Sequence, residues 1–161
     1  MLNNVSVKRS VDGKKLFLIA FFALFLDQLT KQLIRSGLWS FDLGFVQSTL
    51  TYNTGTLWSL FAGPQSNVIF IGISIIILAA VGYTFYKEPQ HRVLLALIFV
   101  GGLGNLIDRI LFGGVIDFIN LGWFPIFNIA DSLLSIGVIL LLLQLLREEF
   151  QNSSWFSRPS K

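Results

Sequence analysis

Four long apolar stretches, separated by more polar segments, dominate the sequence. They cover residues 16–35, 67–86, 93–112 and 129–147. Each is close to the roughly 20 residues that an α-helix needs to cross a bilayer. The first and third become polar in their second halves, from Asp27 and from Asn105, whereas the other two stay apolar over most of their length. The pattern predicts an all-α membrane protein with four transmembrane helices.

Lysine and arginine occupy only alternate connections between these stretches. They precede the first (Lys8, Arg9, Lys14, Lys15), separate the second from the third (Lys87, Arg92) and follow the fourth (Arg147, Arg158, Lys161). The other two connections, at about 36–66 and 113–128, contain neither residue. By the positive-inside rule, both termini and the short 87–92 loop are predicted to be cytoplasmic.

These assignments divide the chain into three parts. They are a cytoplasmic segment at 1–15, a membrane domain at 16–147 and a polar cytoplasmic tail at 148–161. Lys14 and Lys15, followed by a short apolar run, are also typical of a secretory signal peptide. Because no small-residue cleavage site follows that run, we interpret the first span as a retained anchor.

The first outer loop has strand character. Phe41, Leu43 and Phe45 alternate with polar or small residues, and Leu50 and Tyr52 alternate with threonine and asparagine. We therefore expect a small extracytoplasmic β-rich loop between the first two helices.

Composition excludes several classes of catalytic chemistry. Hydrophobic residues make up 53% of the chain and the mean hydropathy is +0.69, as in membrane proteins. There is no cysteine and a single histidine, His91, which excludes a thiol nucleophile and a multi-histidine metal cluster. His91 falls in the predicted cytoplasmic loop, where we expect it to be solvated. The net charge of +3 includes no basic run typical of nucleic-acid binding. Hydrolytic chemistry, if present, must use carboxylates.

Several polar residues fall at one predicted depth, near the outer leaflet. They are Asp27 in the first span, Asn105, Asp108 and Arg109 in the third, and Asn128 and Asp131 at the start of the fourth. Ionisable residues inside a membrane are functional-site candidates. Structural roles are open as well: Asp27 and Lys31 have the i, i+4 spacing of a helix ion pair, with Lys31 reaching the interface. Asp108 and Arg109 are equally candidates for an ion pair, and Gly101 on the same stripe allows close helix approach.

Asp117 and Asp131 are the strongest candidates for catalysis. Asp117 lies between Ile116 and Phe118, and such apolar surroundings raise the pKa of a carboxyl group. Asp131 lies close to a predicted helix N-terminus, where the dipole favours a negative charge. Two carboxyl groups held in opposite protonation states form an acid–base pair. The sequence leaves open whether Asp131 only caps its helix, and whether Asp108 or Asp117 is its partner.

Five short motifs resemble those of one known family, the lipoprotein signal peptidases (signal peptidase II). They are "DQLTK" at 27–31, "YNTG" at 52–55, "GNLIDR" at 104–109, "GGVIDFI" at 113–119 and "FNIADS" at 127–132. The resemblance extends from Leu16 to Leu146. Three departures accompany it. Thr56 and Leu57 replace two small residues, and Val100 replaces the first glycine of a pair whose second member is Gly101. The stretch between Asp117 and Asn128 is also short, which leaves less room for a covering loop or helix.

The resemblance implies a bacterial membrane aspartyl endopeptidase with Asp117 and Asp131 as its catalytic pair. It also implies site-supporting or substrate-binding roles for a larger set: Asp27, Asn53, Gly101, Asn105, Asp108, Arg109 and Asn128. The expected substrate is a diacylglyceryl-modified prolipoprotein, cut just before its lipidated cysteine at the outer leaflet of the cytoplasmic membrane. No metal or cofactor is implied, and we expect a monomer surrounded by membrane lipid.

Two other classes of protein remain compatible with the buried acids. A small proton-coupled transporter uses such acids as a relay, but the second span contains no ionisable residue within its apolar part. A metal-dependent lipid-head-group transferase uses aspartates to hold Mg²⁺. Activity in the presence of a chelator distinguishes that class from a peptidase.

Overall fold

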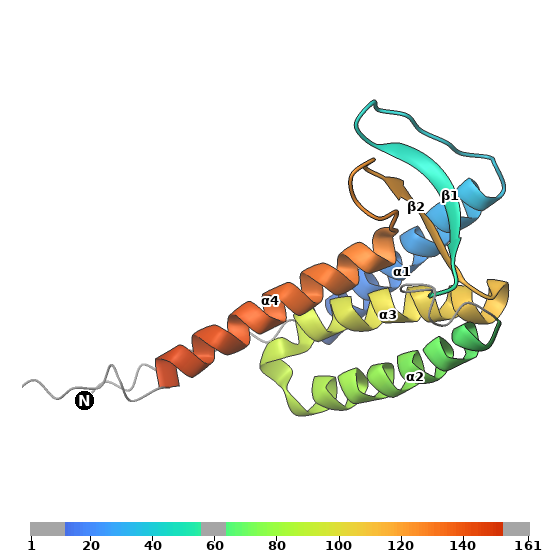
Figure 1. Ribbon diagram of the computed structural model, residues 1–161. Helices are drawn as coiled ribbons and strands as arrows, with labels where there is room; N and C mark the ends of the chain where they lie inside the picture. The colour runs from blue at the N-terminus through green and yellow to red at the C-terminus, as the bar shows by residue number, and fades with distance from the viewer. Residues whose placement is uncertain (1–11, 56–63, 153–161) are drawn as a thin grey trace, which may run out of the picture.

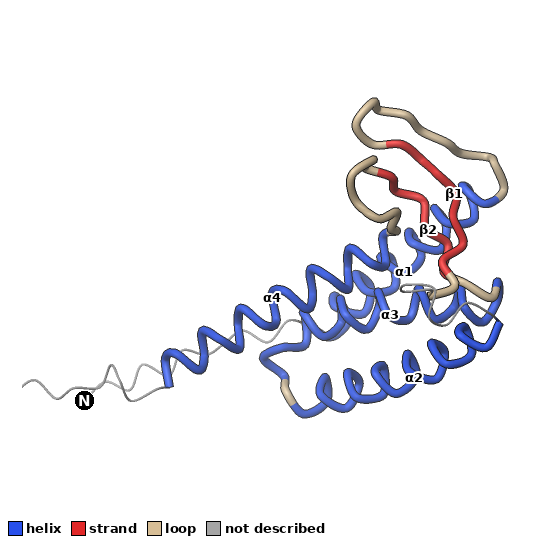
Figure 2. The backbone as a smooth tube through the Cα atoms, in the orientation of Figure 1, coloured by secondary structure: helices blue, strands red, loops and turns tan. Residues whose placement is uncertain are grey.

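The computed structural model describes residues 12–55 and 64–152, and four long helices account for most of them (Figures 1 and 2). They are α1 (Gly13–Arg35), α2 (Pro64–Lys87), α3 (Arg92–Phe112) and α4 (Ile129–Asn152), with a short 3₁₀ turn, η1 (Pro89–His91), before α3. All four are long and apolar enough to cross a membrane. The four predicted spans are confirmed as helices, and α4 continues five residues beyond the predicted end at 147.

Helix α3 is the centre of the bundle, because α1, α2 and α4 all pack against it. The small sheet lies at one end, beside the end of α1 and the start of α4, while η1 and the start of α1 lie at the other (Figure 1). Glycines allow the closest approach of α3 to α4. A Cβ on Gly101 would meet the carbonyl oxygen of Ala130, and one on Gly137 would lie 2.7 Å from Ile98.

The helix ends follow local sequence signals. Asp12 caps α1, its carboxylate accepting a hydrogen bond from the backbone N–H of Lys14 at 3.0 Å. Helix α3 ends at Gly113, which has a left-handed φ of 75° and donates its N–H to the carbonyl of Arg109. The glycine therefore turns the chain directly from the central helix into the following strand.

The sheet has two antiparallel strands, β1 (Gln47–Asn53) and β2 (Val115–Asn120). Thr51 pairs with Asp117 and Asn53 with Val115, and the register shifts between Ser48 and Thr51. Strand β1 lies in the connection between α1 and α2, where the sequence predicted strand character. Its partner β2 comes from the connection between α3 and α4, which the prediction did not include.

The first half of the predicted strand region forms a turn instead. The carboxylate of Asp42 accepts a hydrogen bond from the N–H of Gly44 at 2.8 Å, and Gly44 has a φ of 81°. Leu43 also donates its N–H to the carbonyl of Val46. The apolar alternation of residues 41–45 is therefore overridden by an Asp–Gly turn that reverses the chain into β1.

Candidate active site

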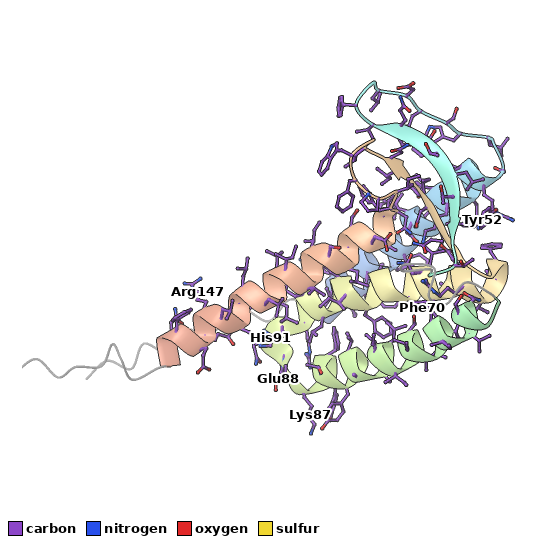
Figure 3. All side chains as sticks on the ribbon, viewed as in Figure 1. Tyr52, Phe70, Lys87, Glu88, His91 and Arg147 are labelled. Atoms are coloured by element: carbon purple, nitrogen blue, oxygen red, sulfur yellow. The ribbon has the colours of Figure 1, made fainter. Side chains whose placement is uncertain are left out.

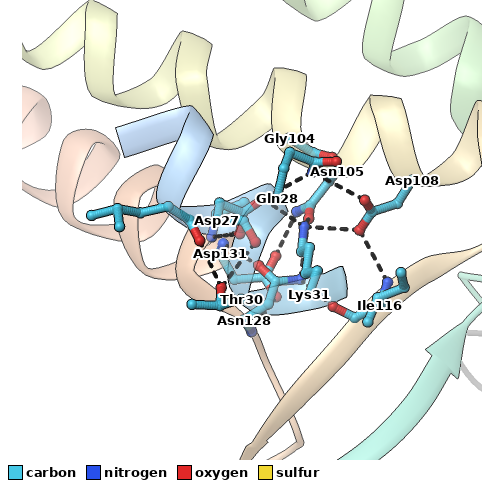
Figure 4. Close-up of polar contacts among 12 residues, drawn as sticks. Asp27, Gln28, Thr30, Lys31, Gly104, Asn105, Asp108, Ile116, Asn128 and Asp131 are labelled. Carbon is cyan, nitrogen blue, oxygen red and sulfur yellow. Dashed lines mark hydrogen bonds and ion pairs between the residues drawn. The ribbon is translucent and has the colours of Figure 1, made fainter. Parts of the chain in front are cut away.

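A fully buried lysine organises the polar cluster at the sheet end of the bundle (Figure 4). The ammonium group of Lys31 lies 2.8 Å from a carboxylate oxygen of Asp27 and 2.8 Å from one of Asp108. It also donates to the side-chain oxygen of Asn105 at 3.1 Å. The Asp27–Lys31 ion pair is confirmed, but Lys31 is 0% exposed and does not reach the interface. Three acceptors match its three N–H groups, as a buried charge requires.

Asp108 is committed to the same cluster and to the strand beyond it. Its Oδ1 accepts a hydrogen bond from Gln28 at 3.1 Å, and its Oδ2 accepts the backbone N–H of Ile116 at 3.1 Å. The cation that pairs with Asp108 is Lys31, and the ion pair suggested between Asp108 and Arg109 is not the arrangement found. Asp108 therefore ties α1 and α3 to the backbone next to Asp117.

The start of α4 is fixed by a reciprocal cap. The N–H of Asp131 donates to the side-chain oxygen of Asn128 at 2.8 Å, and the N–H of Asn128 donates to Asp131 Oδ2 at 3.2 Å. Asp27 accepts the N–H of Ala130 at 2.8 Å. Asp131 also accepts the amide of Asn105 at 2.7 Å through its other oxygen. Its carboxylate is thus part of the cap and is held at the polar cluster as well.

Asp117 lies on β2 and is 2% exposed. Its Oδ2 accepts the amide of Asn53 at 3.0 Å and its Oδ1 accepts that of Asn128 at 2.7 Å. Burial raises the pKa of Asp117 to about 6; the bond from Asn53 opposes this rise, and the negative charge of Asp131 adds to it. The raised pKa agrees with the prediction from its apolar neighbours.

Asn128 connects the two carboxyl groups of interest. Its side-chain amide donates to Asp117, and its backbone N–H donates to Asp131. Asp117 and Asp131 also interact electrostatically. Asp108 differs, because its oxygens bind Lys31, Gln28 and the backbone of β2. The geometry thus favours Asp117 over Asp108 as the partner of Asp131.

Arg109 lies beside this pair. Its guanidinium carbon lies 5.2 Å from the centroid of the Phe70 ring on α2, and the guanidinium interacts electrostatically with Asp117 and Asp131. Gly55, two residues after the end of β1, packs directly on the Phe70 ring. Figure 3 shows Phe70 at the end of the bundle that carries the sheet. Thr56 and Leu57, the departures noted in the sequence, lie outside the described residues.

His91 is not solvated as predicted. It is 5% exposed, with its Nε2 3.7 Å from a carboxylate oxygen of Glu148 on α4. Figure 3 shows it at the end of the bundle away from Phe70 and Tyr52. The η1 turn brings His91 under the last turns of α4, a tertiary contact that loop position alone does not predict.

The sequence missed two members of the site. Gln28 joins Asp27, Asp108 and the carbonyl of Gly104 through one amide nitrogen, and Lys31 was assigned to the membrane interface. Both belong to the "DQLTK" motif, which is the sequence feature from which their place in the site could have been predicted. Among the described residues, no group of three or more His, Cys, Asp or Glu side chains is arranged to hold a metal ion.

The sequence matches the family described as Signal peptidase (SPase) II over residues 19–147. Lipoprotein signal peptidases from Staphylococcus aureus strains JH9 and Newman are each 44% identical to it, over 81% of this chain and 87% of theirs. A solved bacterial membrane enzyme, determined by the in meso method at 2.3 Å resolution, is 38% identical with a TM-score of 0.77, covering 92% of this chain and 95% of its own. A second, at 1.9 Å resolution, is 41% identical with a TM-score of 0.75, covering 83% and 93%.

Proposed function

The chain belongs to the signal peptidase II family, and from this premise we propose that it is an aspartic-type peptidase with Asp117 and Asp131 as its catalytic pair. Family membership makes the chain a peptidase that acts on lipoprotein precursors, and it disfavours the transferase and transporter alternatives. The observation that carries the assignment is the position of Asn128. It donates to Asp117 and to Asp131, and so links these two carboxyl groups and no other pair of aspartates.

The proposed substrate is a prolipoprotein whose cysteine already carries a diacylglyceryl group. Cleavage of the peptide bond before that cysteine releases the signal peptide. Exposed apolar helix faces next to the polar cluster support this choice, because the acyl chains remain in the hydrocarbon layer while the peptide reaches the carboxyl groups. Asn53, Arg109 and Phe70 are the proposed contacts for the substrate on the sheet side.

The proposed mechanism divides acid and base work between the two residues. Asp131, in its ionised form, takes a proton from a water molecule that attacks the scissile carbonyl carbon. Asp117, in its protonated form, donates a hydrogen bond to the developing oxyanion. When the C–N bond breaks, Asp131 passes the proton to the leaving amine. The raised pKa of Asp117, caused chiefly by burial, supports its role as the protonated partner.

The first experiment is cleavage of a diacylglyceryl-modified prolipoprotein by purified protein in detergent, followed by gel mobility. EDTA is present throughout, so that activity does not depend on an added metal. We expect Asp117→Asn and Asp131→Asn to lower the rate by at least about 10²–10⁴-fold, the usual contribution of acid–base groups. Normal cleavage by either variant refutes the assignment of the pair.

Asp42→Asn is the matched control, because Asp42 is an exposed acid in the first outer loop, in a turn with Gly44. Its variant is expected to cleave at the wild-type rate. If Asp108→Asn abolishes cleavage while Asp117→Asn leaves it intact, Asp108 is the catalytic partner instead. If wild-type protein fails to cleave, the substrate assignment itself is wrong.

The proposal includes an orientation in the bacterial cytoplasmic membrane. The termini and the η1 loop face the cytoplasm, residues 1–15 and 148–161 flank the 16–147 peptidase domain, and the sheet and site face outward as part of a monomer. The absence of cysteine from the sequence makes a direct test possible. In intact cells, a membrane-impermeant maleimide is expected to label Trp123→Cys and not Gln90→Cys. The opposite labelling pattern refutes the orientation.

A further inference from the structure

An apolar groove lies between α1 and α2, with α3 as its floor. Its volume is about 760 Å³ and its walls include Phe17, Ala20, Gly82, Ala96 and Phe99. Helices α1 and α2 both pack on α3 and have little contact with each other in the described chain. The small residues on each of the three helices leave room between them. A volume of this size is in the range of sites that enclose small ligands.

The groove has the length of one membrane leaflet. Along α3 its lining runs from Arg92 to Leu103, which at ~1.5 Å per residue is about 17 Å. Half of a hydrocarbon core of about 30 Å is about 15 Å. One end therefore lies at the membrane surface beside η1, and the other lies near the middle of the membrane, short of the polar cluster.

Basic residues lie at the surface end. Arg92 lines the groove there; its Nε donates to the carbonyl of Phe85 at 3.1 Å, and its guanidinium carbon lies 5.5 Å from the Phe85 ring centroid. These contacts hold the side chain at the mouth. A guanidinium has five N–H donors, so its two amino groups retain the fork that binds a phosphate.

Other residues at this end add to the positive charge. Lys14 and Lys15 lie in the first turn of α1, and Lys87 ends α2. Two acids are also near. Asp12 lines the groove and uses its carboxylate to cap α1 at Lys14, and Glu88, next to Lys87, accepts a hydrogen bond from the amide of Gln90 at 2.6 Å. An anionic headgroup is therefore favoured at the mouth, and basic pockets between helices on the cytoplasmic side of a membrane are suited to such lipids.

We propose that this groove is a binding site for one anionic phospholipid, with an acyl chain between α1 and α2 and its phosphate on Arg92. A substrate signal peptide fits less well. Its basic N-terminal region would meet the positive mouth, and a helix that spans the bilayer needs about 30 Å of contact. The site is separate from Asp117 and Asp131, so it does not depend on the catalytic assignment.

Native mass spectrometry of the delipidated full-length protein tests the proposal. Dioleoyl phosphatidylglycerol and dioleoyl phosphatidylcholine, which have the same acyl chains, are added in equal amounts. We expect a single bound lipid, with phosphatidylglycerol preferred about fivefold, as for one added basic contact. Arg92→Gln is expected to remove the preference while lipid still binds, whereas Ala20→Phe, which fills the groove, is expected to lower binding of both lipids.

Two matched variants control for charge and size. Arg147→Gln removes an exposed arginine from α4, and Ile139→Trp enlarges an exposed side chain of the same helix. Both are expected to keep the wild-type preference and stoichiometry. The proposal is overturned if wild type shows no preference, if Arg92→Gln keeps it, or if Ala20→Phe binds lipid normally. Should Ala20→Phe fail to fold, as judged by thermal unfolding, Gly82→Leu fills the opposite wall and decides the same point.

Discussion

The carboxylate of Asp108 accepts a hydrogen bond from the backbone N–H of Ile116 at 3.1 Å, immediately before Asp117 in the chain. Asp108 is itself held by Lys31 at 2.8 Å and Gln28 at 3.1 Å. Side chains from α1 and α3 thereby fix the strand that carries a proposed catalytic carboxyl group. We therefore propose that Asp108 is a positioning residue, which acts on Asp117 through the backbone N–H of Ile116.

This arrangement predicts a partial loss of activity in Asp108→Asn. The amide loses the ion pair with Lys31, and β2 loses part of its anchor. We expect kcat to fall by about 10–100-fold, as small displacements of reacting groups produce, with little change in KM. The measurement is steady-state cleavage kinetics beside Asp117→Asn. A loss of activity as large as that of Asp117→Asn would contradict a positioning role.

Lys31 is predicted to be the most costly lysine to replace. Lys31→Met leaves the carboxylates of Asp27 and Asp108 buried without their cation, and breaking a buried pair costs about 3–5 kcal/mol of unfolding free energy. Lys87→Met removes an exposed lysine from the end of α2 and is expected to change it by less than about 1 kcal/mol. Unfolding in detergent measures both. Equal stability of the two variants would show that the buried network contributes little.

The helices were predictable because their signal is local. Apolar runs of membrane-spanning length identify α1 to α4, and α3 ends at Phe112, where the third apolar stretch ends. The gathering of polar residues at one depth followed from the alternating direction of the spans. Asn105 and Asp131 were predicted to lie at a similar depth, and the hydrogen bond of 2.7 Å between them agrees with that prediction.

The remaining features depend on contacts between distant segments. Strand β2 is defined by pairing with β1, more than 60 residues earlier, as in the Thr51–Asp117 pair. The burial of Lys31 requires Asp108 from another helix, and that of His91 requires Glu148. Hydrophobic periodicity within one segment contains no information about such partners. The sequence therefore indicated which residues are polar in the membrane but not how each is satisfied.

The pH dependence of cleavage is predicted to follow Asp117. In the proposed mechanism this residue must be protonated, so kcat/KM falls as pH rises through its pKa of about 6. The hydrogen bond from Asn53 stabilises the ionised form and lowers this pKa. Asn53→Ala therefore keeps Asp117 protonated to higher pH, and we expect the alkaline limb to shift upward.

Asn120→Ala is the control for this shift. Asn120 lies on β2, as Asp117 does, but its amide donates to the hydroxyl of Thr49 rather than to Asp117. Its pH profile is expected to match that of wild type. An alkaline limb that does not move in Asn53→Ala, or that moves to lower pH, would mean that another group controls the profile.

Close packing of α3 on α4 is predicted to be necessary for both stability and activity. A Cβ on Gly101 would meet the carbonyl oxygen of Ala130 and lie 2.8 Å from the backbone nitrogen of Leu134. Because backbone atoms cannot rotate away, Gly101→Ala must push the start of α4 outward, at a cost of about 1–3 kcal/mol. The same movement takes Asp131 away from Asn105, so cleavage is expected to fall with stability.

Gly72→Ala on α2 is the matched change, since a Cβ there meets nothing within 4 Å. Because alanine has a higher helix propensity than glycine, this variant is expected to be neutral or stabilising by up to about 1 kcal/mol. Thermal unfolding and cleavage rates of the two variants test this difference, and equal behaviour would show that the approach of α3 to α4 does not hold the site together.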